Sequence, residues 1–166
     1  RDYKELRSTL SLYCNVPMEH IIVGNGATEM ISLTMQLLRP KHALLLSPTY
    51  SEYTREIDLV GGHVEEYYLR EDLDFQLDLD DLFAKLDDSV DLLAICNPNN
   101  PTGQTIDRDM LIKILDRCKK QNIVVILDEC FLEFLDEPNR YEMSDLRGEY
   151  PNLLIIKAFT KIFSMP

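Results

Sequence analysis

Five short polar segments hold most of the residues in this sequence whose types are suited to chemistry, and each follows a short apolar run. They are GNGATE, SPTYSEY, NPNNPTG, DECFLEF and TKIFSMP. A lysine at the end of a buried strand, desolvated near other charges, has a lowered pKa and acts as a nucleophilic amine that forms Schiff bases with carbonyl groups. Lys161, in the last segment, is the candidate for this chemistry, although a single lysine in a turn is more often a solvated surface residue.

Groups suited to ligand binding occur in three further segments. GNGATE opens a predicted helix, where the free N–H groups of Ala27 and Thr28 are placed to hold a phosphate. The alternative is an ordinary glycine turn with Thr28 as the helix cap. Tyr50 in SPTYSEY either lies over a flat ligand or packs in the core. Asp128 follows a buried strand, where a carboxylate needs a cation or a hydrogen-bond donor. Three roles are open for Asp128: it binds a ligand, caps a helix or forms a half-buried ion pair.

The segment NPNNPTG is the least ordinary of the five. Its two prolines and its glycine surround asparagines, and this composition makes a rigid turn that fixes an amide side chain in space. Asn100 is then placed to donate a hydrogen bond to an acceptor on a ligand ring. A turn with a purely structural role is the alternative.

Apolar patterns of strand and helix length alternate from residue 20 onward and show how the polar segments are positioned. The runs predicted to be strands are residues 20–23, 43–46, 63–69, 91–96, 123–127 and 152–159. The stretches with helical character are residues 27–38, 51–60, 78–88 and about 107–120. Asp107 is the expected N-cap of the last helix.

The predicted strands are continuously apolar, which is typical of a parallel sheet covered on both faces. We therefore expect one α/β domain over residues 1–166, with three layers: a mainly parallel (mixed) sheet and helices on both of its faces. Ligands bind beyond the carboxyl ends of the strands in such sheets. Because each polar segment follows a predicted strand, the five segments are expected to form one site.

The composition argues against several classes of partner. Seventeen basic residues against twenty-nine acidic ones give a net charge of −12, which is unfavourable for binding nucleic acid or an anionic membrane. The four cysteines form no C-x-x-C pair and the three histidines are scattered, so no metal site is expected. Buried free thiols in a reducing compartment are the expected state of the cysteines. No apolar run has the length of a membrane span and no signal-peptide pattern is present, so we expect a cytoplasmic protein.

Taken together and in order, GNGATE, SPTY, NPNNPTG, DE-x-F and [ST]-K resemble the motifs of the fold-type I pyridoxal-phosphate enzymes. Among these, the chain is similar to the class I/II aminotransferases, and within them to the branch of histidinol-phosphate aminotransferase and threonine-phosphate decarboxylase. The resemblance covers nearly the whole chain. It implies pyridoxal 5'-phosphate as the cofactor and the large, cofactor-binding domain of that fold.

The resemblance also implies a role for each residue around the cofactor ring. Lys161 would form the Schiff base with the cofactor aldehyde and then act as general base toward the substrate. Asp128 would pair with the pyridinium nitrogen and keep it protonated. Asn100 would donate a hydrogen bond to the phenolic oxygen of the ring, and Tyr50 would stack on the ring face.

At the other end of the cofactor, the resemblance implies that the N–H groups of Ala27 and Thr28 and the hydroxyl of Thr160 hold the phosphate. Lys157, four residues before Lys161, has no such role and is expected to be structural. Phe131 stands where many family members have a tyrosine that also contacts the phenolic oxygen, so this hydrogen bond should be missing. Phenylalanine here leans toward the decarboxylase side of the branch.

Parts of the family pattern are not found in the sequence, which suggests a fragment. The G-L-R motif with a phosphate-binding arginine, the small domain that grips the substrate carboxylate, and the family's N-terminal segment are all expected to be absent. The function implied is transamination of an amino acid or an amino-phosphate such as histidinol phosphate, in a homodimer acting on a small molecule. The alternatives are decarboxylation of the threonine-phosphate type on the same cofactor, or a truncated domain without catalysis.

Overall fold

The structure is a computed structural model and describes residues 3–164. Met165 and Pro166, the end of the TKIFSMP segment, lie outside the described residues. Five strands form a single sheet in the order β2-β1-β3-β4-β5, and all four pairings are parallel. No antiparallel strand occurs among the described residues, and the expected α/β class is confirmed. The strands are β1 (His42–Ser47), β2 (His63–Tyr68), β3 (Leu92–Cys96), β4 (Val124–Asp128) and β5 (Leu153–Ile156).

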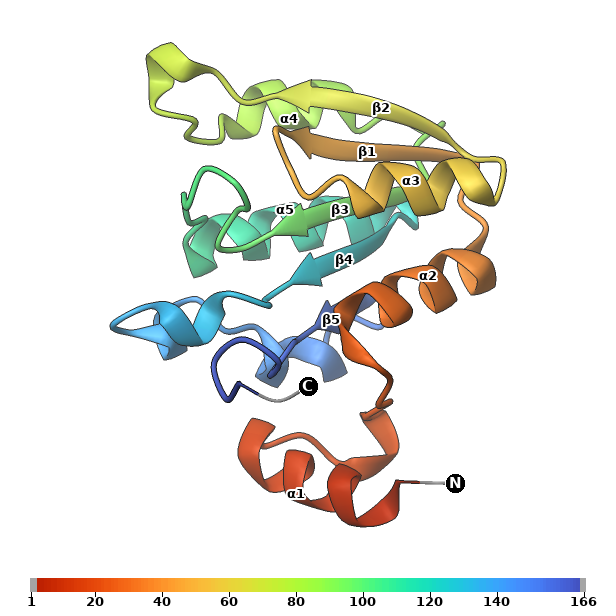
Figure 1. Cartoon of the computed structure of the whole chain (residues 1–166). Helices are drawn as coiled ribbons and strands as arrows, with labels where there is room; N and C mark the ends of the chain where they lie inside the picture. The colour runs from red at the N-terminus through yellow and green to blue at the C-terminus, as the bar shows by residue number, and fades with distance from the viewer. Residues whose placement is uncertain (1–2, 165–166) are drawn as a thin grey trace.

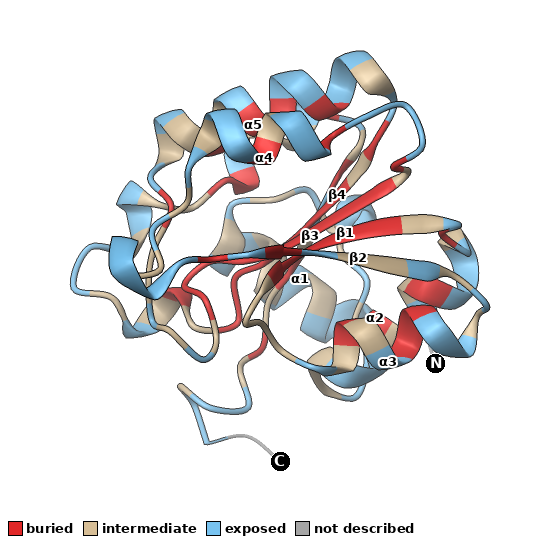
Figure 2. Cartoon of the chain, turned by 90° about the horizontal axis from the view of Figure 1, so that it is seen from above, coloured by how far each residue is buried: buried red, intermediate tan, exposed pale blue. Residues whose placement is uncertain are grey.

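Helices cover both faces of this sheet, as Figure 2 shows in the view along its edge, with α4 and α5 on one side and α2 and α3 on the other. The α-helices are α1 (Lys4–Cys14), α2 (Gly26–Leu38), α3 (Glu52–Leu59), α4 (Leu79–Lys85) and α5 (Arg108–Gln121). Short 3-10 helices complete the chain: η1 (Met18–His20), η2 (Glu71–Leu73), η3 (Leu132–Phe134), η4 (Pro138–Arg140) and η5 (Ser144–Gly148). None of the helices within residues 3–164 is long and apolar enough to cross a lipid bilayer.

Strands β1, β3 and β4 are mostly apolar because successive side chains enter two different cores, whereas the edge strand β2 carries Glu65 and Glu66 and is mostly exposed or half-buried. In β1, Ala43 and Leu45 pack with the buried residues of α2 and α3, while Leu44 and Leu46 pack with those of α4 and α5. This alternation is the period-two geometry of a strand with both faces covered. Local signals fix the helices around the sheet. The Asp107 carboxylate accepts a hydrogen bond of 2.9 Å from the Met110 N–H, which confirms the predicted cap of α5.

Two expectations about the elements are wrong. Residues 20–23 do not join the sheet: they link η1 to α2 as irregular chain, and Ile22 is 78% exposed. A four-residue apolar run has the same pattern whether or not a neighbouring strand is available to pair with it. The predicted strand 152–159 is shorter, because β5 ends at Ile156 and the chain then leaves the sheet.

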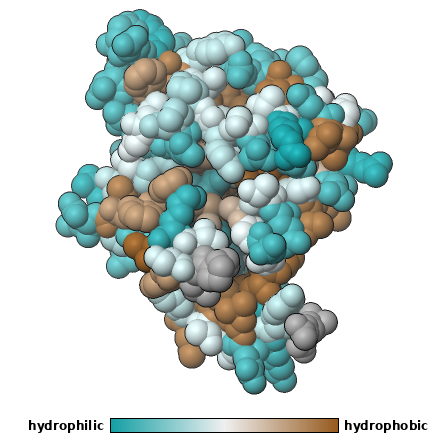
Figure 3. Space-filling view, in the orientation of Figure 1, coloured by the Kyte–Doolittle hydropathy of each residue, from teal (hydrophilic) through white to brown (hydrophobic). Residues whose placement is uncertain are grey.

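The first helix, α1, was not expected from the sequence. It lies apart from the layers, near the C-terminal segment of the chain (Figure 1). Figure 3 shows hydrophobic side chains gathered over this lower part of the molecule. The exposed apolar residues of α1 and of the segments that follow η1 and β5 include Leu12, Tyr13, Ile22 and Phe163.

The strand order creates a point where the chain reverses its direction of travel across the sheet. The chain passes from β1 to its neighbour β2 through α3, and then returns past β1 to place β3 on the other side. The segments that leave β1 and β3 therefore turn to opposite faces and separate at their carboxyl ends, as Figure 1 shows. A crevice is expected at such a point, and the candidate site lies there.

Candidate functional site

A cavity of about 280 Å³ lies at the carboxyl ends of the central strands. All seven site residues predicted from the sequence line it: Ala27, Thr28, Tyr50, Asn100, Asp128, Thr160 and Lys161. The other lining residues are Gly26, Cys96, Pro98, Cys130, Phe131 and Ala158. The folded chain thus brings together residues from all five polar segments, four of which follow strands of the sheet, whereas GNGATE follows irregular chain that does not join it.

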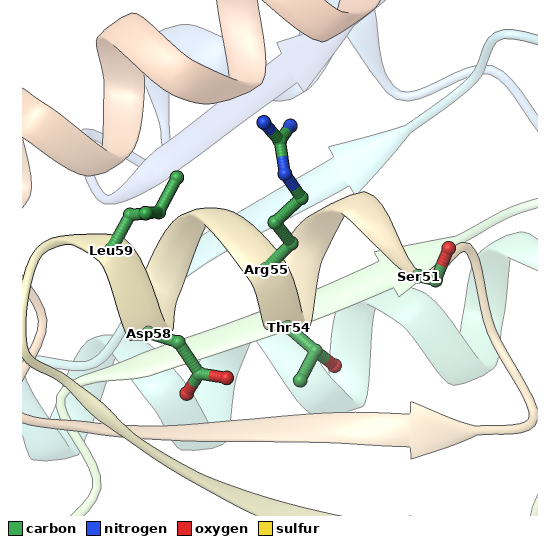
Figure 4. A pocket seen from close by; sticks show the side chains of 5 residues that line it. All are labelled: Ser51, Thr54, Arg55, Asp58 and Leu59. Carbon is green, nitrogen blue, oxygen red and sulfur yellow. The ribbon is translucent and has the colours of Figure 1, made fainter.

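A larger depression of about 580 Å³ lies on the outer surface of α3. Its lining residues all belong to residues 51–59, and Figure 4 shows their side chains spread along one helix, pointing in different directions. A site needs groups from several elements that converge on one point. The depression on α3 lacks this convergence, so the smaller cavity is the candidate site.

The N-terminus of α2 forms one wall of the cavity. The Glu29 carboxylate accepts a hydrogen bond from the Asn25 N–H, and no side chain caps the first turn of the helix. The alternative in which Thr28 caps the helix is therefore not what the structure shows. Instead the Thr28 hydroxyl lies 3.5 Å from the Tyr50 hydroxyl. Uncapped N–H groups at the positive end of a thirteen-residue helix favour an anion.

Asp128 is buried at the end of β4 and is held by two hydrogen bonds. Its Oδ2 accepts a bond of 2.8 Å from the Tyr53 hydroxyl, and its Oδ1 accepts one of 2.9 Å from the Cys130 N–H. Burial, and then the Asp128 charge, raise the pKa of Tyr53 well above its ordinary value, so the phenol stays a donor. The same two causes raise the pKa of Cys96 to about 12, so this lining thiol stays neutral.

The NPNNPTG turn is held by the asparagine side chains that do not line the cavity. Asn97 is fully buried: its Nδ2 donates to the Ile106 carbonyl over 3.0 Å, and its Oδ1 accepts from the Ile106 N–H over 2.8 Å. The Nδ2 of Asn99 donates to the carbonyl of Pro48 and to the hydroxyl of Thr102. The backbone that carries the half-buried Asn100 to the cavity is therefore fixed from both sides.

Lys161 reaches the cavity from the turn that follows β5, five residues beyond Ile156. Its Nζ lies 4.3 Å from the centroid of the Phe131 ring, within the range of a cation–π contact. The expectation that this lysine is desolvated at a strand end is wrong, because its side chain is exposed and the strand ends earlier than predicted. Lys157 is the desolvated lysine of the two, only 11% exposed and ion-paired.

The family model described as aminotransferase class I and II matches residues 1–166. The chain belongs to this family. Threonine-phosphate decarboxylase of Salmonella typhimurium is 34% identical to it over 165 residues, which are 99% of this chain and 44% of that protein. Histidinol-phosphate aminotransferase of Methanococcus aeolicus is 30% identical over 163 residues, or 96% of this chain and 43% of that protein.

A solved structure agrees with these relatives of the class I and II aminotransferases. The crystal structure of histidinol-phosphate aminotransferase from Clostridium acetobutylicum matches with a TM-score of 0.88 and 34% identity. The match covers 99% of this chain and 48% of that one. The chain therefore spans less than half the length of the relatives it matches.

Tyr53 is the main residue at the site of this aminotransferase-family chain that the sequence reading missed. It lies in the core of α3 and reaches Asp128, which is 75 positions further along the chain. Tyr50 precedes α3, which begins at Glu52, and Tyr53 lies in its first turn, so no shared helix face marks this pair in the sequence. The rings of these two tyrosines pack edge to face with centroids 6.5 Å apart.

Proposed function

We propose that residues 1–166 are the core of the large, cofactor-binding domain of a pyridoxal-phosphate-dependent aminotransferase. The observation that carries the proposal is the convergence of five segments, four of which follow strands of the sheet, on one cavity that contains an amine, a carboxylate, an amide, an aromatic ring and a helix N-terminus. The small domain and the N-terminal segment typical of the family would lie outside these residues. Each group in the cavity comes from a different element, which a packing role does not require.

The residues present fit pyridoxal phosphate by the chemistry of their donors and acceptors. Each carboxylate oxygen of Asp128 accepts one hydrogen bond, which leaves acceptor capacity for a ring N–H. The uncapped N-terminus of α2 suits a phosphate. Among the described residues, no carboxylate lies within ion-pair distance of Lys161, so its amine is not committed to a partner.

When bound, this cofactor supplies an aldehyde that condenses with amines and a ring that accepts electrons. The chain would do the rest. Lys161 would bind the aldehyde through Nζ with loss of water. Once the substrate amine has taken its place there, the freed Nζ would take the proton from the substrate α-carbon. Asp128, oriented by Tyr53, would hold a proton at the ring nitrogen. Asn100 would donate a hydrogen bond to the ring oxygen, and Tyr50 would cover one ring face and exclude water.

The phosphate would be held at the other end of the cavity. The N–H groups of Ala27 and Thr28 would donate to it from the first turn of α2, and the Thr160 hydroxyl would donate from the lysine turn. Gly26 begins the helix with a φ of 80°, a left-handed value that favours glycine. These contacts would hold the phosphate end of the cofactor in the cavity.

Transamination of an amino acid or an amino-phosphate is the reaction we propose, because the relatives include histidinol-phosphate aminotransferases. Decarboxylation of the threonine-phosphate type is the second candidate. It is favoured by the 34% identity to the Salmonella decarboxylase and by Phe131, which brings a ring without a hydroxyl to the cavity. Both reactions use the same groups and differ in which substrate bond stands perpendicular to the cofactor ring.

We also propose a setting for the intact protein: a cytoplasmic homodimer that acts on a small molecule and binds neither nucleic acid nor membranes. Cys96, Cys118 and Cys130 are buried free thiols, which fit a reducing compartment. The exposed apolar residues near α1, such as Leu12 and Ile22, offer a surface for a second copy. The net charge of −12 fits the absence of a polyanionic partner.

The cofactor proposal is tested by adding pyridoxal phosphate to the intact protein. The protein should develop a visible absorbance band, and after borohydride reduction peptide mapping should place the added mass on Lys161. Lys161→Ala should lose both signals, while Lys113→Met, at an exposed position on α5, should keep them. A label on Lys157, or no band at all, would overturn the proposal.

The two candidate reactions are separated with the same preparation. Histidinol phosphate with an amino-accepting keto acid should give amino transfer. O-Phosphothreonine should release carbon dioxide only if the decarboxylase candidate is right. Release of carbon dioxide without amino transfer would replace the first candidate with the second.

A further inference from the structure

Directly behind the cavity, one lysine is surrounded by three carboxylates. The Nζ of Lys157 lies 3.0 Å from Glu129 Oε2, 3.3 Å from Glu133 Oε1 and 3.2 Å from Glu142 Oε1. The Lys157 side chain is 11% exposed and that of Glu129 is 0% exposed. We call these four residues the Lys157 cluster. Desolvating such charges is costly, so the cluster is a poor way to gain stability alone.

The cluster and the cavity share two stretches of backbone. In the stretch that leaves β4, Asp128, Cys130 and Phe131 line the cavity, whereas Glu129 points into the cluster. In the stretch that leaves β5, Ala158, Thr160 and Lys161 line the cavity, whereas Lys157 points into the cluster. A displacement of either stretch would therefore move groups on both sides at once.

The turn that carries Lys161 has few backbone hydrogen bonds to the rest of the fold. The sheet ladder ends where the Glu129 N–H donates to the Ile156 carbonyl over 2.8 Å. Beyond it, the backbone hydrogen bonds described for residues 157–164 run within the turn, from Phe163 to Phe159 and from Ser164 to Lys161. The ion pairs of Lys157 are thus the first attachment of this turn after it leaves the sheet.

The charges of the Lys157 cluster suit it to hold the two exits together and not to act as a nucleophile or base. Burial raises the pKa of Glu129 to about 7. Burial alone would lower the pKa of Lys157, but the three carboxylates outweigh it and raise this pKa. Lys157 therefore stays a cation near neutral pH, and its amine is unavailable as a nucleophile.

We propose that Lys157 is a positioning residue of the site: by binding Glu129, Glu133 and Glu142 behind the sheet, it sets the distance between Asp128 and Lys161 inside the cavity. The inference rests on the proposed function, because it concerns where the cofactor-binding groups stand. Catalytic groups need to be held within about 0.5 Å of their working positions. One ammonium that binds three segments at once, the exit of β4, η3 and the loop before η5, can hold the β5 exit to that tolerance.

The test compares four variants of the intact protein with the native one. Lys157→Met removes the charge, and Lys157→Arg keeps it. The double variant Lys157→Met/Glu129→Met also removes the most buried carboxylate, so it leaves one fewer buried charge without a partner than the single Met variant does. Lys113→Met on the exposed side of α5 is the matched surface control. The readouts are the dissociation constant for pyridoxal phosphate, the midpoint pH of the visible absorbance band, and the thermal midpoint.

Both Met variants should bind pyridoxal phosphate about tenfold or more weakly and should shift the midpoint pH of the band, because Lys161 and Asp128 are no longer held in register. Lys157→Arg should stay within about threefold of the native affinity. Lys113→Met should be unchanged in all three readouts. A purely structural role for Lys157 predicts a lower thermal midpoint with native affinity and a native midpoint pH in the folded protein.

The outcomes separate this inference from the function on which it rests. A folded double variant with native affinity and a native midpoint pH overturns the positioning role and leaves the proposed function intact. A native protein that forms no band on Lys161 overturns the proposed function, and the positioning role with it. Weakened binding by the double variant, with rescue by arginine at position 157, supports the inference.

Discussion

The segments that leave β4 and β5 place a carboxylate and a lysine on each of two sides, in the cavity and in the Lys157 cluster, and the same residue types have different surroundings on the two sides. Asp128 and Glu129 are adjacent buried carboxylates, yet Asp128 faces the cavity with hydrogen bonds alone and Glu129 faces a lysine. Lys161 and Lys157 are four positions apart, yet one lies over an aromatic ring and the other among three carboxylates. The alternation of side chains along an extended backbone produces the first contrast. The second arises because the chain leaves the sheet after Ile156 and turns between the two lysines.

The comparison shows that the groups able to bind a ligand and the groups that fix the position of the two exits are different residues. On the cavity side, polar groups keep unused donors and acceptors, which is what a ligand needs. In the Lys157 cluster, the charged groups are committed to one another and fix where the two exits stand. A reactive group is held in position best when residues other than the reactive group make the contacts that fix its backbone. The predictions below test this division.

The largest effect is expected when the two adjacent carboxylates are neutralised one at a time. Asp128→Asn cannot hold a proton on a ring nitrogen, so kcat should fall by about 10²–10³-fold. Glu129→Gln leaves Lys157 with two other carboxylates and should cost no more than about tenfold. Steady-state kinetics on the intact protein measure both values. Equal losses in the two variants would contradict the division between the two sides.

The fold was largely predictable because its inner strands β1, β3 and β4 are buried on both faces. The apolar runs at 43–46, 91–96 and 123–127 fall within or beside observed strands, and the polar segments after them do meet. Whether an apolar run pairs with a neighbouring strand is less predictable than the run itself, since residues 20–23 form a strand-like run that no strand pairs with. The helix α1 was not predicted, although Leu6, Leu10 and Tyr13 have helical spacing, and it packs both on the neighbouring η1 and on the distant Phe159.

For the site, residue type and position relative to a strand end were enough to name the lining residues. The partners of those residues were not predictable. Tyr53 meets Asp128 across 75 positions, and the Lys157 cluster draws on separate segments between residues 129 and 157. Such pairs depend on the packing of α3 and on the path of the loops after β4. No local pattern in the sequence encodes either.

The second effect concerns the pH dependence of stability. Burial raises the pKa of Glu129 to about 7 from an ordinary 4.5, against the nearby Lys157 charge. The folded protein thus binds this proton more tightly than the unfolded chain does. The contribution of Glu129 to stability is therefore complete below an ordinary glutamate pKa and is lost as the pH rises through about 7.

Glu129→Gln removes this titration while it keeps the shape of the side chain. Between about pH 5 and pH 8, the native protein should lose on the order of 2–3 kcal/mol of unfolding free energy relative to the variant. Urea unfolding across that range measures the difference. Parallel stability curves for the two proteins would show that Glu129 does not titrate as its burial implies.

A smaller effect is expected from the hydrogen bond that orients Asp128. Tyr53→Phe removes the donor to Oδ2, and a hydrogen bond to a charged group stabilises a fold by about 1.5 kcal/mol or more. Tyr150→Phe is the matched control. The Tyr150 hydroxyl donates a hydrogen bond of 2.9 Å to Asp116, and neither residue lines the cavity. Both variants should lose stability, but only Tyr53→Phe should weaken pyridoxal-phosphate binding. Unchanged binding in both would mean that Tyr53 is ordinary core.

The smallest effect tests whether aromatic contacts with α1 also help to position the turn that carries Lys161, as the Lys157 cluster is proposed to do. The Tyr13 ring of α1 packs edge to face on Phe159 at 5.4 Å and on Phe163 at 6.0 Å between centroids. Tyr13→Ala should cost about 1 kcal/mol of unfolding free energy, and Leu12→Ala, at an exposed neighbour, close to none. Because these contacts carry no charge, Tyr13→Ala should weaken cofactor binding less than Lys157→Met does. The reverse order would make α1, and not the ion cluster, the element that holds Lys161 in place.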